Sequence, residues 1–249
     1  MIATINYKSR NRKIDLTKPL DISIPLRASK ENVNAWYIDE PKIEPVVIDE
    51  WKAAVSEGAS INFNNIQFNP HAHGTHTECV GHITEKVHSV NKNLKQFFFL
   101  AEVVTVAPER YMGDTMISKT QLKFALGNKQ RDAIVIRTLP NMTEKKSKQY
   151  SHTNWTYLQE DAVAFLVQSG IKHLLIDQPS VDREEDGGEL KSHKAFWNYG
   201  GKLRKDCTIT ELIFVPNSIE DGTYFLNLQI APFENDATPS KPVLYKIIE

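Results

Sequence analysis

Hydrophobic and polar positions alternate in some parts of the chain and form continuous apolar runs in others. The runs 96–106 (QFFFLAEVVTV) and 132–138 (DAIVIRT) predict buried strands. Residues 13–26 and 60–68 alternate between apolar and polar side chains, which predicts extended segments, and the prolines of the first indicate an edge strand at most. Shorter strands are predicted at 173–177, 206–215, 223–231 and 242–248.

Two segments have the spacing of helices. Residues 118–126 predict a short helix capped by Ser118. Residues 157–169 place apolar side chains at helical intervals, and Gly170 follows as a stop before the strand at 173–177. This order is typical of a βαβ-like unit, so the sheet should be mixed. We therefore predict an α/β fold with one domain over residues 1–249, in which helices flank a mixed β-sheet, and loops at 27–44 and 142–154.

The composition is that of an ordinary globular protein. The chain has 249 residues, of which 41% are hydrophobic and 24% are charged, and its net charge is −1. This balance argues against a nucleic-acid partner or an anionic membrane surface. The N-terminal segment lacks the apolar stretch of a secretory signal, and no apolar run reaches the roughly 20 residues of a membrane helix. With only two cysteines, Cys79 and Cys207, we expect a cytoplasmic protein.

The segment 69–83 (NPHAHGTHTECVGHI) holds four of the chain's eight histidines. In an extended chain every second side chain lies on the same face, so His76 and Glu78 point the same way, and His82 joins them if the turn at 79–81 keeps that side. Imidazoles and a carboxylate that converge in this way are ligands for Zn²⁺, Mn²⁺ or Fe²⁺. The alternatives are ordinary surface or hydrogen-bonded histidines, and a structural zinc site, which the lack of a Cys-x-x-Cys pair disfavours.

The string HGTHTECVGH (73–82) resembles the motif His-x-Gly-Thr-His-x-Asp-x-Pro-x-His of the cyclase-like metal-dependent hydrolases, a family that includes bacterial kynurenine formamidase and isatin hydrolase. KIDLTKPLDISIPL (13–26) resembles the N-terminal strand of this family, and HLLIDQPSVD (173–182) resembles its Ser-Val-Asp segment. His193 and Glu211 stand where the family has a histidine and then a glutamate in an apolar strand. The resemblance covers most of the chain in the same order, and it implies a swivelling β/β/α cyclase-like fold.

The resemblance also implies a role for each matching residue. His76 would be a metal ligand, and Glu78 stands where the family has a metal-bridging aspartate. His82 matches the histidine that shuttles protons. His193 would bind a second metal, and Glu211 would bridge or ligate. The implied cofactor is a divalent metal, Zn or Mn, as one or two ions.

Glu211 also stands out by its surroundings, because it lies between Ile209 and Ile213 on an apolar strand. An unpaired charge in such a place would be costly, so a metal or an arginine should accompany it. His193 lies in a polar stretch, where an ordinary surface histidine is the alternative.

The sequence departs from the family at the first ligand. Ala72 occupies the place of the leading histidine, and His71 and His73 flank it. By strand parity both would face away from the other ligands, although a local bulge could bring one back, and we favour His71 over His73. Glu78 is one methylene longer than the family's aspartate, which would shift the metal or the carboxylate.

The resemblance implies a hydrolase that acts on a small amide, formamide or cyclic amide through metal-activated water. One alternative is an arylformamidase that hydrolyses N-formylkynurenine, and another is a non-catalytic binding protein that kept the fold. Trp36 is the favoured substrate-binding residue, with Tyr37 or Phe68 as further members of an aromatic wall, although each of them could equally pack in a core or an oligomer contact. The expected partners are a small-molecule substrate and a second copy, as a homodimer or larger homo-oligomer.

Overall fold

The computed structural model describes residues 1–248. Its largest sheet is closed into a barrel, because the first strand in its order also pairs with the seventh. The strands in spatial order are β16 (Gly222–Ile230), β9 (Phe98–Val106), β12 (Ala133–Thr138), β14 (His173–Ile176), β15 (Thr208–Glu211), β8 (His76–Glu78) and β17 (Ala237–Lys246), with β3 (Leu20–Asp21) added to the outside of β17. The sequence predicted each of the barrel strands except β8, with ends that differ by a few residues.

The barrel is mixed, as predicted. Strands β9, β12, β14 and β15 run parallel to one another, whereas β8, β16 and β17 pair with their neighbours in the antiparallel sense. The parallel strands are separated by helices, which supply the crossover connections that parallel neighbours need. This confirms the α/β class with a mixed sheet and flanking helices.

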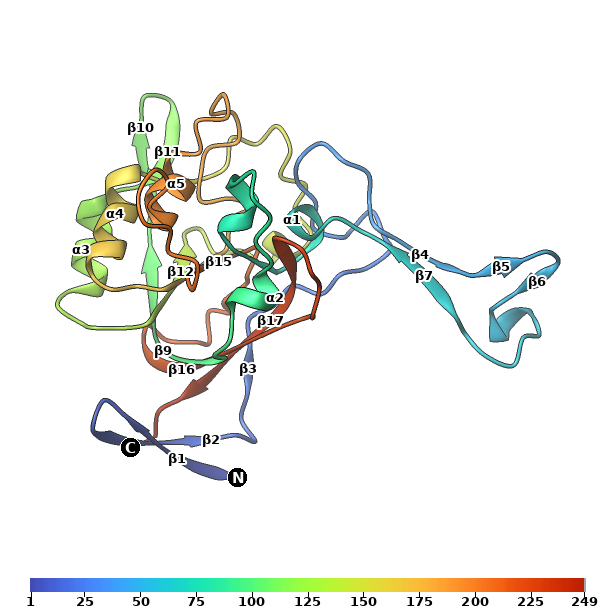
Figure 1. Ribbon diagram of the computed structural model, residues 1–249, viewed down its shortest axis with the longest axis horizontal. Coiled ribbons are helices and arrows are strands. Elements are labelled where there is room, and N and C mark those ends of the chain that lie inside the picture. The colour runs from blue at the N-terminus through green and yellow to red at the C-terminus, as the bar shows by residue number, and fades with distance from the viewer. Residues whose placement is uncertain (249) are drawn as a thin grey trace.

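Strand β12 shows why the parallel strands read as continuous apolar runs. Ala133 and Val135 belong to the apolar cluster inside the barrel, whereas Ile134 and Ile136 belong to a second cluster outside it. The outer cluster lies beneath α3 (Lys119–Leu126), α4 (Glu160–Gln168) and α5 (Lys191–Trp197), which gather on one side of the barrel (Figure 1). Both faces of β12 are therefore buried, and each large apolar side chain contributes about 1.5–3 kcal/mol.

The predicted helices are present with corrected ends. Ser118 caps α3 in a capping box with Gln121, as its position suggested. Helix α4 begins only at Glu160, because the backbone of Tyr157–Leu158 forms β13 beside β11 (Asp114–Ile117). Gly170 lies in the left-handed region at φ 83°, which fits its predicted role as a stop.

Two elements were missed by the sequence patterns. Helix α5 was read as a polar stretch, and α1 (Pro70–His73) as extended chain. The predicted loop at 142–154 contains a turn of 3₁₀ helix, η3 (Thr143–Lys146). The remaining short elements are the hairpins β1 (Ile2–Tyr7) with β2 (Arg10–Asp15) and β10 (Glu109–Tyr111) with β11, and the helices α2 (Val90–Asn93), η1 (Val55–Glu57) and η2 (Val80–Ile83).

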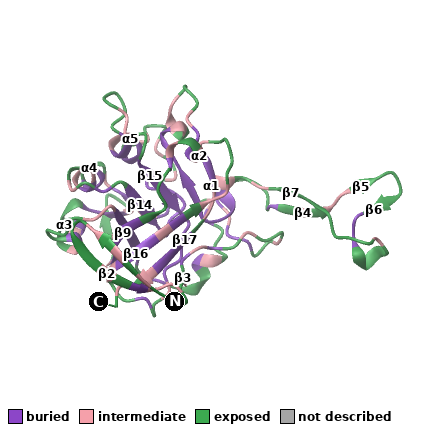
Figure 2. Ribbon diagram, turned by 60° about the horizontal axis from the view of Figure 1, so that its bottom comes forward, coloured by how far each residue is buried: buried purple, intermediate pink, exposed green. Residues whose placement is uncertain are grey.

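An arm extends far from the barrel (Figure 1). We call residues 42–67 the arm; it contains the pairs β4 (Lys42–Pro45) with β7 (Asn64–Gln67) and β5 (Val47–Ile48) with β6 (Trp51–Lys52). The predicted extended segment 60–68 forms its return strand, but Figure 2 shows it almost entirely exposed. Within residues 1–248, no helix has the length and apolar character to cross a membrane.

Candidate functional site

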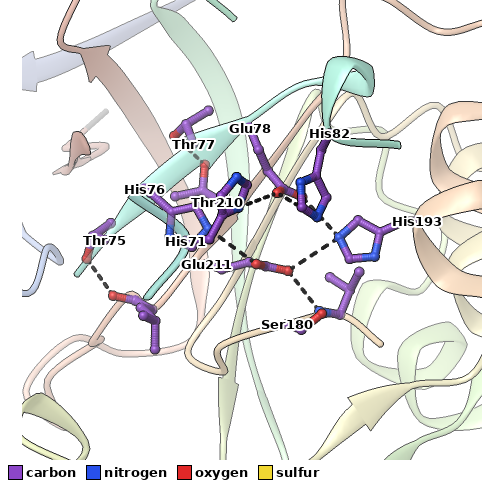
Figure 3. Close-up of polar contacts among 12 residues, drawn as sticks. His71, Thr75, His76, Thr77, Glu78, His82, Ser180, His193, Thr210 and Glu211 are labelled. Atoms are coloured by element: carbon purple, nitrogen blue, oxygen red, sulfur yellow. Dashed lines mark hydrogen bonds and ion pairs between the residues drawn. The ribbon is translucent and has the colours of Figure 1, made fainter. Parts of the chain in front are cut away.

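The site begins with two neighbouring strands, β8 and β15. Their antiparallel register sets His76 opposite Glu211, and side chains opposite each other in a sheet share a face. Glu78, two residues after His76, lies on that face too, and His193 of α5 points toward it (Figure 3). On the other face Thr77 and Thr210 share a hydrogen bond of 2.8 Å between their hydroxyls. The side chains of His76 and Glu78 therefore point to the same face of the sheet, as predicted.

His71 joins these residues by a route that strand parity did not foresee. The chain at α1 turns as a helix rather than bulging as a strand, and this turn brings His71 Nδ1 to 3.2 Å from Glu78 Oε2. His73 points elsewhere, with its Nε2 2.9 Å from the carbonyl oxygen of Asp39. The expected strand bulge is absent. The single helical turn of α1 instead directs one of the two imidazoles, that of His71, towards the site. The structure brings His71, and not His73, to the site.

His82 lies on η2, directly after β8. Its Nε2 is 3.9 Å from Glu78 Oε2, and its side chain is 30% exposed, at the outer edge of the site. The close packing of η2 depends on Gly81, because a Cβ at that position would lie 2.1 Å from the backbone oxygen of His88. The turn between β8 and η2 thus keeps His82 on the same side as Glu78, which was the condition for His82 to join the site.

His193 approaches from α5, on the opposite side of Glu78. Its Nε2 lies 3.1 Å from Glu78 Oε1 and 3.9 Å from Glu211 Oε1, and its side chain is buried. Its Nδ1 lies 2.6 Å from Asp182 Oδ2, while Asp182 Oδ1 accepts the backbone N–H of Ser192 at 2.7 Å. His193 is therefore not a surface histidine, and Asp182 fixes both its ring and the start of its helix.

Two buried atoms of this cluster have no hydrogen bond of good geometry among residues 1–248, namely His76 Nε2 and Glu78 Oε2, although His71 Nδ1 lies 3.2 Å from the latter. His76 Nδ1 lies 3.1 Å from the carbonyl oxygen of Gly74, which can only accept, so the neutral ring carries its lone pair on Nε2. That nitrogen faces Glu211 Oε2 at 3.4 Å. A lone pair that faces a carboxylate is repelled by it unless a proton or a metal ion lies close to both atoms, and the residues present fit a divalent metal in that place.

Three sets of side chains in the described chain bring one ligand atom each to within 4.8 Å of the others. They are His71 with His76 and Glu78, Glu78 with His82 and His193, and His71 with His82 and Asp236. Glu78 belongs to two of these sets, as the position of a bridging carboxylate requires. Glu211 belongs to none of them, but it contacts both His76 and His193, and no arginine accompanies it in the contacts described above.

The charges of the cluster shift the pKa values of its members. Burial raises the pKa of Glu78, but the nearby imidazoles of His82 and His193 outweigh burial and hold it well below its usual range. Burial lowers the pKa of His193, and the carboxylates of Glu78 and Asp182 raise it well above the usual value. For His71, the hydrogen bonds with Asp236 and Glu78 overcome burial and raise the pKa to about 10. Without a metal, the site is a set of buried ion pairs.

Two acids at the site were not foreseen. Asp182 lies in the segment 173–182 that carried the family resemblance, and its place in the loop that follows the buried strand β14 was a usable hint. Asp236 lies in the loop between β16 and β17, where its Oδ2 is 2.9 Å from His71 Nε2 and 3.3 Å from His82 Nδ1. No sequence pattern near Asp236 points to the site.

The aromatic residues considered for substrate binding lie in packing contacts. The ring of Trp36 packs edge-on against Trp155 at 4.8 Å between centroids, beside an apolar cluster that includes Leu212. Tyr37 donates a hydrogen bond of 2.7 Å to Glu184. The thiol of Cys79 points away from the cluster of histidines and carboxylates, since it donates a hydrogen bond to the carbonyl oxygen of His88 at 3.2 Å. The role of Trp36 in substrate binding stays a prediction.

The fold and the site together define an α/β protein with a histidine–carboxylate centre between a closed mixed sheet and its covering helix. The family model described as "Putative cyclase" matches residues 14–183, about two thirds of the chain. The chain therefore belongs to the cyclase family, which confirms the resemblance found in the sequence.

The relatives and structural neighbours agree with this assignment. The kynurenine formamidase of Bacillus cereus is 24% identical over 233 residues, which are 92% of this chain and 97% of that protein. A structure described as a "potential metal-dependent hydrolase with cyclase activity" has a TM-score of 0.66 at 17% identity and covers 92% of this chain and 97% of its own. An isatin hydrolase bound to the product analogue thioisatinate also has a TM-score of 0.66, at 14% identity and 92% coverage of each chain. These structures share the fold of this protein.

Proposed function

We propose that the protein is a metal-dependent hydrolase of carbon–nitrogen bonds in small amides, formamides or cyclic amides. One observation carries the proposal: His76 Nε2 and Glu78 Oε2 are buried without a hydrogen bond of good geometry in the described chain, and they face further imidazoles and a carboxylate. Uncompensated buried polar atoms cost about 1–3 kcal/mol each, so a cluster of them indicates a ligand. The names of the related proteins, a kynurenine formamidase and an isatin hydrolase, support the same class of reaction.

His71, His76 and Glu78 would hold one ion, and Glu78 with His193 and Glu211 offers a place for a second. A divalent ion bound among these side chains lowers the pKa of water towards about 7 and polarises a carbonyl oxygen. Neutral imidazoles and carboxylates without a thiolate suit Zn²⁺ or Mn²⁺. Glu78 is buried completely, so it excludes water from the inner side of the site.

His82 is the residue we assign to proton transfer. Its side chain is partly exposed at the outer edge of the site, and its Nε2 faces the same carboxylate oxygen as the ligand His71. In this position His82 takes a proton from water as general base and returns it to the leaving nitrogen as general acid. Trp36 remains the proposed aromatic contact of the substrate.

The first experiment compares the metal content of wild type, His76→Ala and His88→Ala after dialysis. His88→Ala is the matched control, since its side chain belongs to none of the three ligand sets. We expect Zn or Mn in wild type and in the control, and a loss in His76→Ala. If wild type holds no more metal than His76→Ala, the proposal is wrong.

The second experiment separates the alternatives by activity, with and without a chelator, on formanilides, lactams and N-formylkynurenine. Chelator-sensitive turnover across the panel supports the broad hydrolase. Turnover confined to N-formylkynurenine favours an arylformamidase, which the related kynurenine formamidase makes the leading alternative. Tight binding without turnover would instead support a non-catalytic protein, for which the alanine at position 72 is the one argument.

A further inference from the structure

Asp236 reaches the site from a part of the chain that the family model does not match, since that match ends at residue 183. Its loop is held by two backbone hydrogen bonds, one from Cys79 N in the histidine segment to Asp236 O at 3.0 Å and one from Val90 N at the start of α2 to Asn235 O at 2.9 Å. The next residue, Ala237, pairs with Glu78 in the sheet. The position of Asp236 is therefore set by the barrel itself.

A single carboxylate oxygen lies close to two imidazole rings. Asp236 Oδ2 lies 2.9 Å from His71 Nε2 and 3.3 Å from His82 Nδ1. The opposite nitrogen of each ring faces inwards, with His71 Nδ1 3.2 Å and His82 Nε2 3.9 Å from the same atom, Glu78 Oε2. The two rings lie 4.3 Å apart and only 30° from parallel. Asp236 and Glu78 thus hold this pair of rings from its outer and inner sides.

This arrangement determines which nitrogen of each ring is free. A carboxylate only accepts hydrogen bonds, so His71 Nε2 and His82 Nδ1 both donate to Asp236. The nitrogens left to ligate or to move a proton are then His71 Nδ1 and His82 Nε2, and both face the buried oxygen of Glu78. Carboxylates that fix metal-site histidines in this way orient the ring and increase its basicity.

We propose that Asp236 is the positioning residue that lets His71 act in place of the histidine missing at position 72, and that it orients His82 at the same time. The inference rests on the proposed metal-dependent function. It explains how a histidine displaced by one position along the chain still presents a defined nitrogen to the site. Ala72 itself is fully buried, and its methyl group offers no ligand atom.

The competing arrangement is that Asp236 is itself a ligand. Asp236, His71 and His82 place one ligand atom each within 4.8 Å of one another, which would suit an outer ion. Asp236 Oδ2 lies within hydrogen-bond distance of both His71 Nε2 and His82 Nδ1, while the opposite nitrogen of each ring faces Glu78 on the inner side. We therefore favour positioning, and the number of bound ions distinguishes the two roles.

The test uses Asp236→Ala and Asp236→Asn in the full chain, with Glu234→Gln as the matched control. Glu234 lies in the same loop, but its carboxylate pairs with Lys92 and Asn91 at the surface. The measurements are zinc per chain, zinc affinity by competition with a chelator, and the absorption spectrum of the Co²⁺-loaded protein. Circular dichroism establishes that each variant is folded.

For a positioning role we expect the ion count of wild type, zinc affinity weakened about 10–100-fold in Asp236→Ala, and a changed Co²⁺ spectrum. Asp236→Asn should lie between Asp236→Ala and wild type, because its amide oxygen still accepts a hydrogen bond but carries no charge. If Asp236→Ala does not fold, the Asp236→Asn variant decides the matter by the same measurements.

Two results would overturn the inference while the proposed function stands. One is zinc affinity and a Co²⁺ spectrum in the Asp236 variants equal to those of Glu234→Gln. The other is the loss of one ion per chain, which would make Asp236 a ligand. A wild type that binds no divalent ion would contradict the proposed function, and this inference with it.

Discussion

His193 Nε2 lies 3.1 Å from Glu78 Oε1, although 115 positions separate the two residues in the chain. Both side chains are buried, and the contact joins helix α5 to strand β8. Because two charges without water are stable only when they face each other, neither residue can be changed alone without cost. The same pair therefore stabilises the fold and positions two of the side chains that we propose to hold the metal.

Replacing Glu78 with glutamine tests this coupling. The variant keeps the size of the side chain but removes the anion that faces His71, His82 and His193. We expect the metal-free protein to lose about 3–5 kcal/mol of unfolding free energy, because buried cationic imidazoles then lack their partner, and metal binding to be lost. Urea unfolding of chelator-treated protein measures the first effect.

The control for this variant is Glu220→Gln, which removes an exposed carboxylate 3.5 Å from Lys246. Surface ion pairs of this kind contribute about 0–1 kcal/mol, so its unfolding midpoint should stay near that of wild type. Equal midpoints for Glu78→Gln and Glu220→Gln would contradict the assignment of Glu78 as the central anion.

Proton release on metal binding is a second consequence. The carboxylates around His71 raise its pKa to about 10, and those around His193 raise its pKa well above the usual value, so both rings are protonated at pH 7 when no metal is bound. A ligating nitrogen must lose its proton, so zinc affinity should fall as the pH falls over the whole range below about 10, the pKa of His71. Calorimetry in two buffers of different ionisation enthalpy counts the protons released.

We expect about one proton from each of these rings that ligates, and about one fewer in His71→Ala. The wild-type protein should therefore show a heat of binding that depends on the buffer. Zinc binding that releases no protons between pH 6 and pH 8 would mean that neither ring ligates the ion.

Most of the barrel strands and the outer helices α3 and α4 could be predicted because their patterns are local. Strands β9 and β12 are buried on both faces, so nearly every position is apolar, and Ser118 with Gln121 marks the start of α3 within four residues. These features need no knowledge of distant parts of the chain.

The rest depended on tertiary contacts that a single sequence does not display. His193 lies in a polar stretch, and its burial follows only from packing against Glu78 and Asp182. Asp236 has no motif around it, since its role comes from a barrel strand that returns beside β8. Strand parity gave no reason to favour His71 over His73. The structure has a single turn of helix at α1 where a strand was expected, and this turn separates the two side chains.

Acid sensitivity should arise partly from a histidine outside the site. His173 is buried, with its Nδ1 2.9 Å from the Thr208 hydroxyl and its ring 3.8 Å from that of Phe99. Burial, helped by the charge of Lys172, lowers its pKa from 6.5 to about 3. The unfolded chain then binds a proton that the folded chain refuses, so this part of the stability is complete above pH 6.5 and is lost as the pH falls towards 3.

Because of this one group, the free energy of unfolding at pH 4.5 should be about 2–3 kcal/mol lower than at pH 7. The variant His173→Asn keeps a hydrogen-bonding group near Thr208 but does not titrate, so its stability should fall less between the two values. Urea midpoints of both proteins at pH 7 and pH 4.5 give the comparison. A variant that loses as much stability as wild type would show that His173 is not the group responsible.

The arm of residues 42–67 makes the last prediction, which concerns association. It carries large apolar side chains that are exposed, namely Val47, Ile48, Trp51, Val55, Ile61, Phe63 and Ile66. An isolated two-stranded hairpin is at best marginally stable in water, and exposed apolar surface of this kind is typical of an interface. We propose that a second copy of the chain covers the arm, since an isologous contact would bury both arms at once.

Light scattering after gel filtration should then give about twice the 28.4 kDa mass of one chain. Phe63→Asp, in which a 56% exposed ring becomes a charge, should shift the mass to that of the monomer without unfolding the barrel. Val87→Asp is the matched control, because Val87 is 82% exposed but lies outside the arm, and it should leave the dimer intact. A wild-type protein of monomeric mass, or a Phe63→Asp variant that stays dimeric, would contradict the proposal that a second copy covers the arm.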